Sequence, residues 1–345
     1  MSRRVLLRLL IVAIVVAAVF VSVGGLSAQG RSGDAFDRVR EVQQRHTAKL
    51  MAQKGVVGTA VGLSENGRPA MLVLLEEAGV AGVPAELDGV SVRQIVTGKI
   101  EALAPGRATA AKSPPQKKID PKDWFERPVP IGVSTGNAGE CSAGTIGCRV
   151  KKGAAVYALS NNHVYALEND AAIGSEVVQP GLYDTRCGYN ADNVIGTLSQ
   201  FVEIDFNGGD NTVDAAIALS STVNIGNATP ANGYGTPSST TMPAALGMAV
   251  QKYGRTTALT KGTITGIDGI INIGYSSGTA RFVDQIIVTS RSPFIKAGDS
   301  GSLLVTDPDT NPVGLLFAGD SSGKFAIANH IDDVLDALGV TVDGE

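Results

Sequence analysis

The chain has 345 residues, 42 of them glycine, with only 5% aromatic and 18% charged residues. Glycine is well above its usual share of about 7% and charge is low, which excludes a coiled coil, a long helical bundle and a polyelectrolyte tail. A hydrophobic content of 43% excludes global disorder, and a net charge of −4 gives no electrostatic footprint for nucleic acid. We therefore expect a turn-rich globular protein of about two domains, dominated by β-structure.

The first 28 residues have the features of an export signal. Arginines precede an apolar run from Leu9 to Val23, and small residues follow up to Ala28. This order predicts a signal peptide, residues 1–28, that is cleaved after Ala28, and hence a secreted or periplasmic protein. The alternative is an uncleaved anchor, because the apolar run could nearly span a bilayer. We expect membrane association only in that second case.

Three cysteines lie beyond this segment: Cys141, Cys148 and Cys187. In an exported protein they allow one disulfide and leave one thiol, with three pairings open. We favour Cys141–Cys187, because Cys148 lies in an apolar strand pattern where a buried thiol behaves as a small hydrophobe. Cysteine and histidine are not clustered at zinc-binding spacings, so we expect no metal site.

Residues 29–102 predict a small α+β domain. Apolar residues recur at helical spacing from Asp34 to Lys54, and Gly55 marks the end of that pattern. The apolar runs Val56–Leu63 and Ala70–Leu75 are separated by an Asn-Gly pair, which predicts a hairpin, and Val90–Val96 predicts a third strand. The position of this unit suggests a companion or pro-domain that assists the folding of the C-terminal part or restrains its activity. An appended module with its own ligand is the alternative.

Residues 103–130 have the composition of a linker. Six prolines fall in this stretch, with alanine, lysine and serine between them. An exposed linker is the expected place for proteolytic nicking.

Residues 131–345 predict a second, β-rich domain. Short apolar segments recur with glycine, asparagine, serine or proline between them, which is typical of a sandwich or barrel. Only Ile331–Leu338 has a helical pattern. The predicted strands are Val156–Ser160, Val194–Leu198, Ala215–Leu219, Gly262–Ile267, Gln285–Thr289, Ser302–Thr306 and Val313–Phe317.

The strongest chemical signal is Ala297–Ser302, with the sequence Ala-Gly-Asp-Ser-Gly-Ser. A serine flanked by glycines on a turn can expose its hydroxyl, and nearby backbone N–H groups can converge on a substrate oxygen. Serine is a weak nucleophile alone and needs a base within hydrogen-bond reach, for which histidine is best suited near neutral pH.

The chain has only three histidines. His46 lies in the predicted N-terminal helix, and His330 lies at the start of the C-terminal helix, where packing or capping is expected. His163 comes after a predicted strand, at an exit where functional groups often lie. Asp214 stands at the mouth of a buried strand and is the best carboxylate to orient the imidazole, since other candidates lie in polar loops. The candidate set is therefore His163, Asp214 and Ser300.

In this order, the set resembles that of the secreted trypsin-like serine endopeptidases of the chymotrypsin fold, bacterial type. The resemblance covers Ile131 to about Val342. Further stretches match the family in the same order: the strand before the histidine, a hairpin common in bacterial members, the strand that lines the specificity pocket and the closing helix (Ala158–His163, Gly254–Ile264, Gly314–Gly319 and Ile331 onward).

The resemblance implies a mainly β fold, namely a chymotrypsin-like double six-stranded β-barrel with a C-terminal helix, preceded by the small α+β N-terminal domain. It implies hydrolysis of peptide bonds through an acyl-enzyme on Ser300, with His163 as base and Asp214 as its orienting acid. The N–H groups of Gly298 and Ser300 would form the oxyanion hole. The substrate is a protein or peptide, no cofactor is needed, and a monomer is expected.

The same resemblance places further residues around the serine. A pocket formed by Phe294, Phe317 and Gly319 would suit an apolar or small side chain. Asp299 would be structural, facing Arg255 or a freed amine at Ile131.

The match is not complete. Ser302 stands where the family has a second glycine, and Asn161 and Asn162 replace small residues before the histidine. One alternative is a protease-fold binding or scaffold protein without activity. Another is an esterase-type α/β-hydrolase using Ser300, Asp320 and His330, but Ser302 breaks its Gly-x-Ser-x-Gly pattern.

Overall fold

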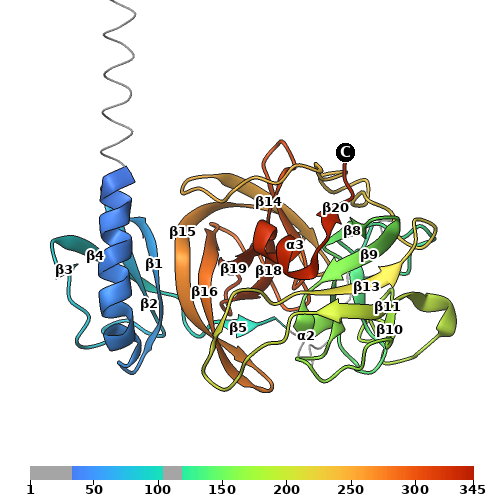
Figure 1. The fold of residues 1–345 in the computed structure, drawn as a ribbon, viewed down its shortest axis with the longest axis horizontal. Coiled ribbons are helices and arrows are strands. Elements are labelled where there is room, and N and C mark those ends of the chain that lie inside the picture. Colours follow the sequence, from blue (N-terminus) through green and yellow to red (C-terminus); the bar gives the residue numbers. More distant parts are fainter. Residues whose placement is uncertain (1–32, 104–118) are drawn as a thin grey trace, which may run out of the picture.

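A computed structural model describes residues 33–103 and 119–345 of the chain. These residues are mainly β, and their strands gather into two curled sheets (Figure 1). The expected signal peptide and its cleavage site lie outside the described residues, as do residues 104–118 of the expected linker.

The N-terminal unit is a helix packed on a sheet. The helix covers residues 33–51, close to the predicted range, and buries Val39, Val42 and Leu50 against the strands beneath it. Strands β1 (Val56–Leu63) and β2 (Pro69–Leu75) form the expected antiparallel hairpin, and a third strand pairs with β2 in parallel. Helical periodicity predicted the helix, and apolar runs on either side of an Asn-Gly turn predicted β1 and β2, which are buried on both faces.

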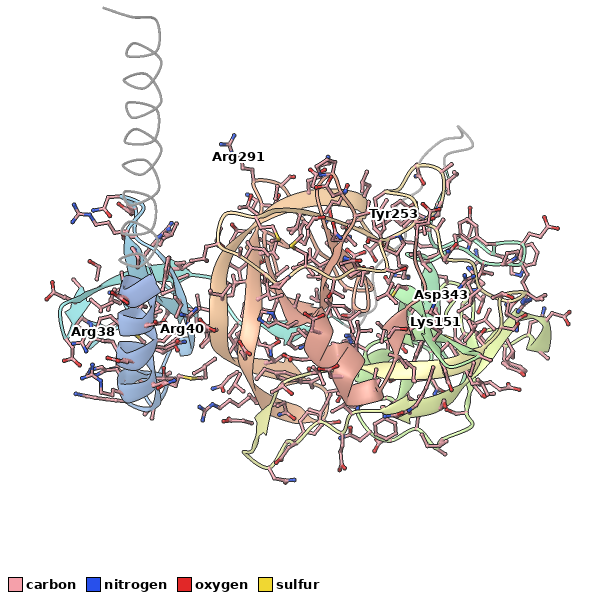
Figure 2. All side chains as sticks on the ribbon, turned by 45° about the horizontal axis from the view of Figure 1, so that its top comes forward. Arg38, Arg40, Lys151, Tyr253, Arg291 and Asp343 are labelled. Atoms are coloured by element: carbon pink, nitrogen blue, oxygen red, sulfur yellow. A yellow bond between two sulfur atoms is a disulfide. The ribbon has the colours of Figure 1, made fainter. Side chains whose placement is uncertain are left out.

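The N-terminal unit shares its sheet with the rest of the chain. Strand β1 pairs antiparallel with the long strand β15 (Ala258–Tyr275), with Thr59 opposite Ile270. Arg40 on the helix lies on the side that faces the C-terminal part (Figure 2) and donates to Asp268 Oδ2 at 2.9 Å. Figure 1 shows the N-terminal helix and strands beside β15. The two units are therefore continuous through backbone hydrogen bonds.

The larger sheet has 12 strands, including those of the N-terminal unit. Its path runs β12-β16-β19-β18-β17-β14-β15-β1-β2-β4-β3, and β5 pairs with both β15 and β18. Its remaining strands are β3 (Glu86–Leu87), β4 (Val90–Val96), β5 (Glu101–Ala102), β12 (Asp210–Asn211), β14 (Ala249–Gly254), β15 (Ala258–Tyr275), β16 (Gly278–Thr289), β17 (Leu303–Thr306), β18 (Pro312–Gly319) and β19 (Phe325–His330).

The second sheet has 8 strands in the order β20-β8-β9-β13-β11-β10-β6-β7. It encloses a core that also includes the apolar face of helix α3 (Ile331–Leu338), the range over which the sequence predicts a helix. Two short helices precede β13: α2 (Asn162–Tyr165) and the 3-10 turn η1 (Ala191–Asn193). The strands are β6 (Ser134–Asn137), β7 (Gly144–Thr145), β8 (Cys148–Lys152), β9 (Ala155–Ser160), β10 (Glu176–Val178), β11 (Val194–Phe201), β13 (Ala216–Ser220) and β20 (Thr341–Val342).

The end of the expected linker packs on the second sheet. Arg127 donates to the carbonyls of Asp192 and Val194, and buried Val129 donates its N–H to the carbonyl of Asn224. Arg127 and Val129, which fall within the expected linker, are thus packed against the C-terminal part.

Candidate active site

Strand pairing brings His163 and Asp214 together. His163 lies in α2 directly after β9, Asp214 lies just before β13, and these strands are antiparallel neighbours with Ser160 opposite Ala216. His163 Nδ1 lies 2.6 Å from Asp214 Oδ2, and the His163 backbone N–H donates to Asp214 Oδ1 at 3.2 Å. Both side chains are almost fully buried, which strengthens these contacts by excluding water.

Three further contacts hold Asp214. Its N–H donates to Asn329 Oδ1 at 3.0 Å, and its carbonyl accepts from Asn161 Nδ2 at 2.7 Å. The Tyr275 hydroxyl donates to Asp214 Oδ2 at 2.9 Å. Asn161, which departs from the family pattern, therefore helps to hold the backbone of the carboxylate.

Ser300 lies on a tight turn between β16 and β17. Gly298 and Gly301 have φ of +94° and +90°, a region that L side chains rarely adopt. A Cβ at Gly298 would overlap Arg255 Nη1, and one at Gly301 would overlap Ser160 Oγ. The turn is held by the Thr145 N–H, which donates to the Ser300 carbonyl at 2.8 Å. Glycine on both sides of the serine is thus a backbone requirement.

Asp299 pairs with a buried lysine and not with Arg255, which corrects that expectation; the expected pairing with a freed Ile131 concerns the cleaved chain. Lys252 Nζ lies 3.3 Å from Asp299 Oδ2, and neither side chain is exposed. Burial lowers the pKa of Lys252, while Asp299 acts in the opposite direction. Arg255 instead pairs with Asp184, and the Ile131 N–H donates to a backbone carbonyl. Family resemblance alone could not identify this cation, since the hairpin register decides it.

The serine hydroxyl is engaged away from the histidine. Ser300 Oγ donates to the Phe317 carbonyl at 3.1 Å and lies 3.4 Å from the Leu103 carbonyl. Among the described residues His163 Nε2 is buried without a hydrogen-bond partner. Ser300 Oγ and His163 Nε2 are therefore not hydrogen-bonded to each other in this structure.

A segment of the N-terminal unit occupies the cleft at Ser300. Strand β5 pairs antiparallel with β18, with Ala102 opposite Ala318. The next residue, Leu103, donates its N–H to the Phe317 carbonyl at 3.4 Å and accepts from the Gly298 N–H at 2.9 Å. The Leu103 carbonyl thus lies on a backbone donor predicted for the oxyanion hole.

The Leu103 side chain lies beside the predicted pocket residue Gly319. It packs on a buried cluster that contains Phe294 and Ile295, and its Cδ1 lies 3.4 Å from a Cβ placed on Gly319. Phe317 lines the cleft with its carbonyl, whereas its ring packs on Phe282 at a centroid distance of 4.7 Å. The strand pattern alone could not decide which way the Phe317 side chain turns.

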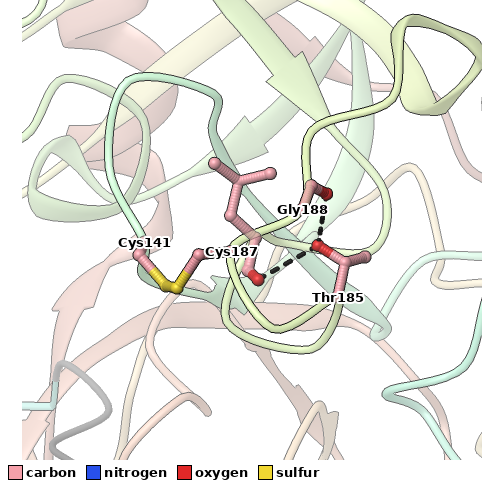
Figure 3. The surroundings of a disulfide bond; sticks show 5 residues. Cys141, Thr185, Cys187 and Gly188 are labelled. Atoms are coloured by element: carbon pink, nitrogen blue, oxygen red, sulfur yellow. Dashed lines mark hydrogen bonds between the residues drawn. A yellow bond between two sulfur atoms is a disulfide. The ribbon is translucent and has the colours of Figure 1, made fainter.

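A hollow of about 400 Å³ continues the cleft beyond Leu103, and its lining includes His163, Cys141 and Glu168. Cys141 is disulfide-bonded to Cys187, as predicted, and Thr185 braces the same loop through the carbonyls of Leu182 and Gly188 (Figure 3). Cys148 is free and buried, and burial raises its pKa to about 12.

The remaining sequence candidates lie in other surroundings. His46 Nε2 contacts Asp88 in the N-terminal unit at 2.8 Å. His330 lies 3.7 Å from Asp284, and Asp320 bonds within its own turn to Ser322 and to the Phe325 N–H. The structure does not join Ser300, Asp320 and His330 into the set that an α/β-hydrolase would need.

Sequence reasoning missed Leu103 and Tyr275. Leu103 falls within the expected linker because prolines come after it, and Tyr275 lies at the end of a strand whose outer half was not predicted. The run Ile270–Tyr275, with isoleucine recurring along it, was the available signal for that longer strand.

Residues 33–103 and 119–345 contain no cluster of metal-ligating side chains and no helix that could span a membrane. No protein-family model and no curated protein matches the chain.

Solved structures with similar folds are serine proteases. A glutamic acid specific serine protease is 22% identical and matches over 62% of this chain and 100% of its own, with a TM-score of 0.46. Thermobifida fusca protease A is 19% identical over 63% of this chain and 100% of its own, with a TM-score of 0.45. Nocardiopsis protease is 17% identical over 62% of this chain and 99% of its own, with a TM-score of 0.44. All three matches are at low identity, with TM-scores below 0.5.

Proposed function

We propose that the chain is a serine endopeptidase with a chymotrypsin-like double β-barrel in residues 131–345. Ser300 is the nucleophile, His163 the general base and Asp214 the orienting carboxylate. One observation supports this most. The carbonyl of the chain's own Leu103 accepts from the Gly298 N–H at 2.9 Å and lies 3.4 Å from Ser300 Oγ. A peptide carbonyl held by a backbone donor beside a serine hydroxyl is the arrangement that acyl transfer requires.

The steps of the reaction depend on these positions. Ser300 Oγ turns toward His163 Nε2, gives up its proton and attacks the carbonyl carbon. The negative oxygen that forms is stabilised by the N–H of Gly298 and that of Ser300, and removal of one such donor costs about 3–4 kcal/mol. His163 then gives the proton to the leaving amine, an ester on Ser300 remains, and water hydrolyses it by the reverse proton transfers. Asp214 keeps the imidazole in the required tautomer through the 2.6 Å contact.

The bond after Leu103 is the proposed first substrate. It lies at the start of the expected linker, where nicking is expected. Cleavage there would break the covalent link between the N-terminal unit and the peptidase. Strands β1 and β5 would remain paired with β15 and β18. The N-terminal unit therefore acts as a pro-domain, because its carboxyl end continues to fill the cleft after the cut.

The pocket favours an apolar side chain before the scissile bond. Leu103 packs on the cluster that includes Phe294 and Ile295, and its Cδ1 lies within contact distance of the Gly319 position. Burial of an apolar side chain there is favourable, whereas a carboxylate or ammonium would be desolvated without a partner. The disulfide at the rim of the hollow supports an oxidising, exported location, as the expected signal peptide requires.

Two measurements on the full chain test this proposal. A fluorophosphonate probe should label the protein at one serine, and Ser300→Ala should abolish the labelling. Ser64→Ala, which changes a serine in the exposed β1–β2 turn, should label normally. Wild-type protein should also yield a new amino terminus at Ala104, whereas Ser300→Ala should stay intact.

The alternative is a binding or scaffold protein that retains the fold. It is favoured by one contact, since Ser300 Oγ donates to Phe317 instead of to His163. Absence of labelling together with an intact chain would support this alternative and overturn the peptidase.

A further inference from the structure

The tip of the β15–β16 hairpin reaches the buried carboxylate of the candidate triad. Tyr275 is the last residue of β15, and its hydroxyl donates to Asp214 Oδ2 at 2.9 Å. His163 Nδ1 lies 2.6 Å from the same oxygen, while Oδ1 accepts the His163 backbone N–H at 3.2 Å. Tyr275 therefore contributes one of the donors that orient the Asp214 carboxylate.

The ring of Tyr275 is held on several sides by aromatic contacts. It meets Phe206 edge to face at a centroid distance of 5.5 Å, and stacks on Phe282 at 6.2 Å. Its ring also lies edge to face with the His163 imidazole, with centroids 5.9 Å apart. Such packing fixes the direction of the hydroxyl and shields the pair from water.

The hairpin tip is attached on both sides. Glu168, in the loop after α2, accepts from Ser276 N and Oγ and from Ser277 N at 2.8–3.3 Å. On the other side, the Gly274 N–H donates to the Ile100 carbonyl at 3.0 Å, just before β5. These contacts determine where the Tyr275 hydroxyl lies.

We propose that Tyr275 is a positioning residue of the peptidase, which aligns the Asp214 carboxylate with His163 Nδ1. This inference rests on the proposed function. The hydroxyl stays protonated as a donor because burial, together with Asp214, raises the Tyr275 pKa well above its ordinary value. Without it, the carboxylate is held only by the two His163 contacts, one at each oxygen, and its alignment with the imidazole is less restrained.

The test compares Tyr275→Phe with wild type, with rates expressed per active site titrated by the fluorophosphonate probe. We expect kcat to fall about tenfold, as loss of a hydrogen bond to a charged group implies, and KM to stay unchanged. Tyr253→Phe is the matched control, because that buried hydroxyl donates to Asn232 and lies outside the triad. It should leave both constants unchanged.

A double-mutant cycle separates positioning from general destabilisation. If Tyr275 acts through Asp214, adding Tyr275→Phe to the Asp214→Asn variant, which lacks the carboxylate, should lower kcat less than twofold. An independent tenfold loss in that background, or an unchanged kcat in the single variant, would overturn the proposal. If Tyr275→Phe fails to fold, Glu168→Ala tests the same idea, because it releases the hairpin tip that carries Tyr275. The same fall in kcat is expected, and an unchanged kcat would count against the proposal.

A readout without turnover keeps this proposal distinct from the proposed function. The proton between His163 and Asp214 should give a downfield NMR signal that moves in Tyr275→Phe and stays in place in Tyr253→Phe. If wild type neither labels nor cleaves, the peptidase is wrong, and this signal still decides whether Tyr275 positions the pair. An identical signal in wild type and Tyr275→Phe would overturn the positioning role.

Discussion

Replacing Leu103 with alanine should raise the peptidase activity of the self-cleaved protein about five- to thirtyfold. The tail that ends at Leu103 fills the cleft, so active enzyme requires it to leave. Leucine has three more carbons than alanine, each worth about 0.8 kcal/mol when fully buried. Since Leu103 is only partly buried, we expect the alanine tail to be held about 1–2 kcal/mol more weakly.

The assay is hydrolysis of a short chromogenic peptide with leucine before the reporter group. Samples are compared only after mass spectrometry shows complete cleavage after residue 103. A synthetic peptide of residues 97–103 should inhibit, and its alanine version should inhibit less by the same factor. Glu101→Gln is the control, because Glu101 is exposed although it belongs to β5. Equal activity of wild type and Leu103→Ala would refute the occupied cleft.

Three further predictions concern the triad, the turn and the hairpin. Asp214→Asn should lower kcat about 10⁴-fold, whereas Asp205→Asn, in a polar loop, should leave it nearly unchanged in the same peptide assay. Gly301→Ala should lower the free energy of unfolding in urea by about 3 kcal/mol, because its Cβ would overlap neighbours at φ +90°. The control is Gly153→Ala, at φ +59° with open space around it, which should lower the same free energy by about 1 kcal/mol. Burial alone would raise the pKa of Glu168, but hydrogen bonds from Ser276 and Ser277 hold it below its ordinary value. The stability from this carboxylate is fully present above the ordinary pKa of a glutamate and is lost as the pH falls through the lowered pKa of Glu168, so the acid loss of thermal stability should be smaller in Glu168→Gln.

Local pattern was sufficient for much of the fold. Short apolar runs between turn residues predicted β1, β2 and β9. Helical spacing predicted a helix over Asp34–Lys54, found at residues 33–51, and the helix α3, because a surface helix must bury one face. The scarcity of histidine and the serine between glycines identified His163 and Ser300 as candidates, since few residue types can perform this chemistry. The disulfide was favoured because Cys148 fits an apolar strand.

Tertiary structure decided what depends on contacts between distant segments. Asp214 accepts from Tyr275, Asp299 pairs with Lys252, and Leu103 lies on the Gly298 N–H only because sheet register brings their strands together. A one-residue change of register would turn the side chains of Lys252 and Tyr275, which lie in β14 and β15, to the opposite face of the sheet. The sequence by itself therefore determined which residues could do the chemistry, and the fold determined what holds them and what fills their cleft.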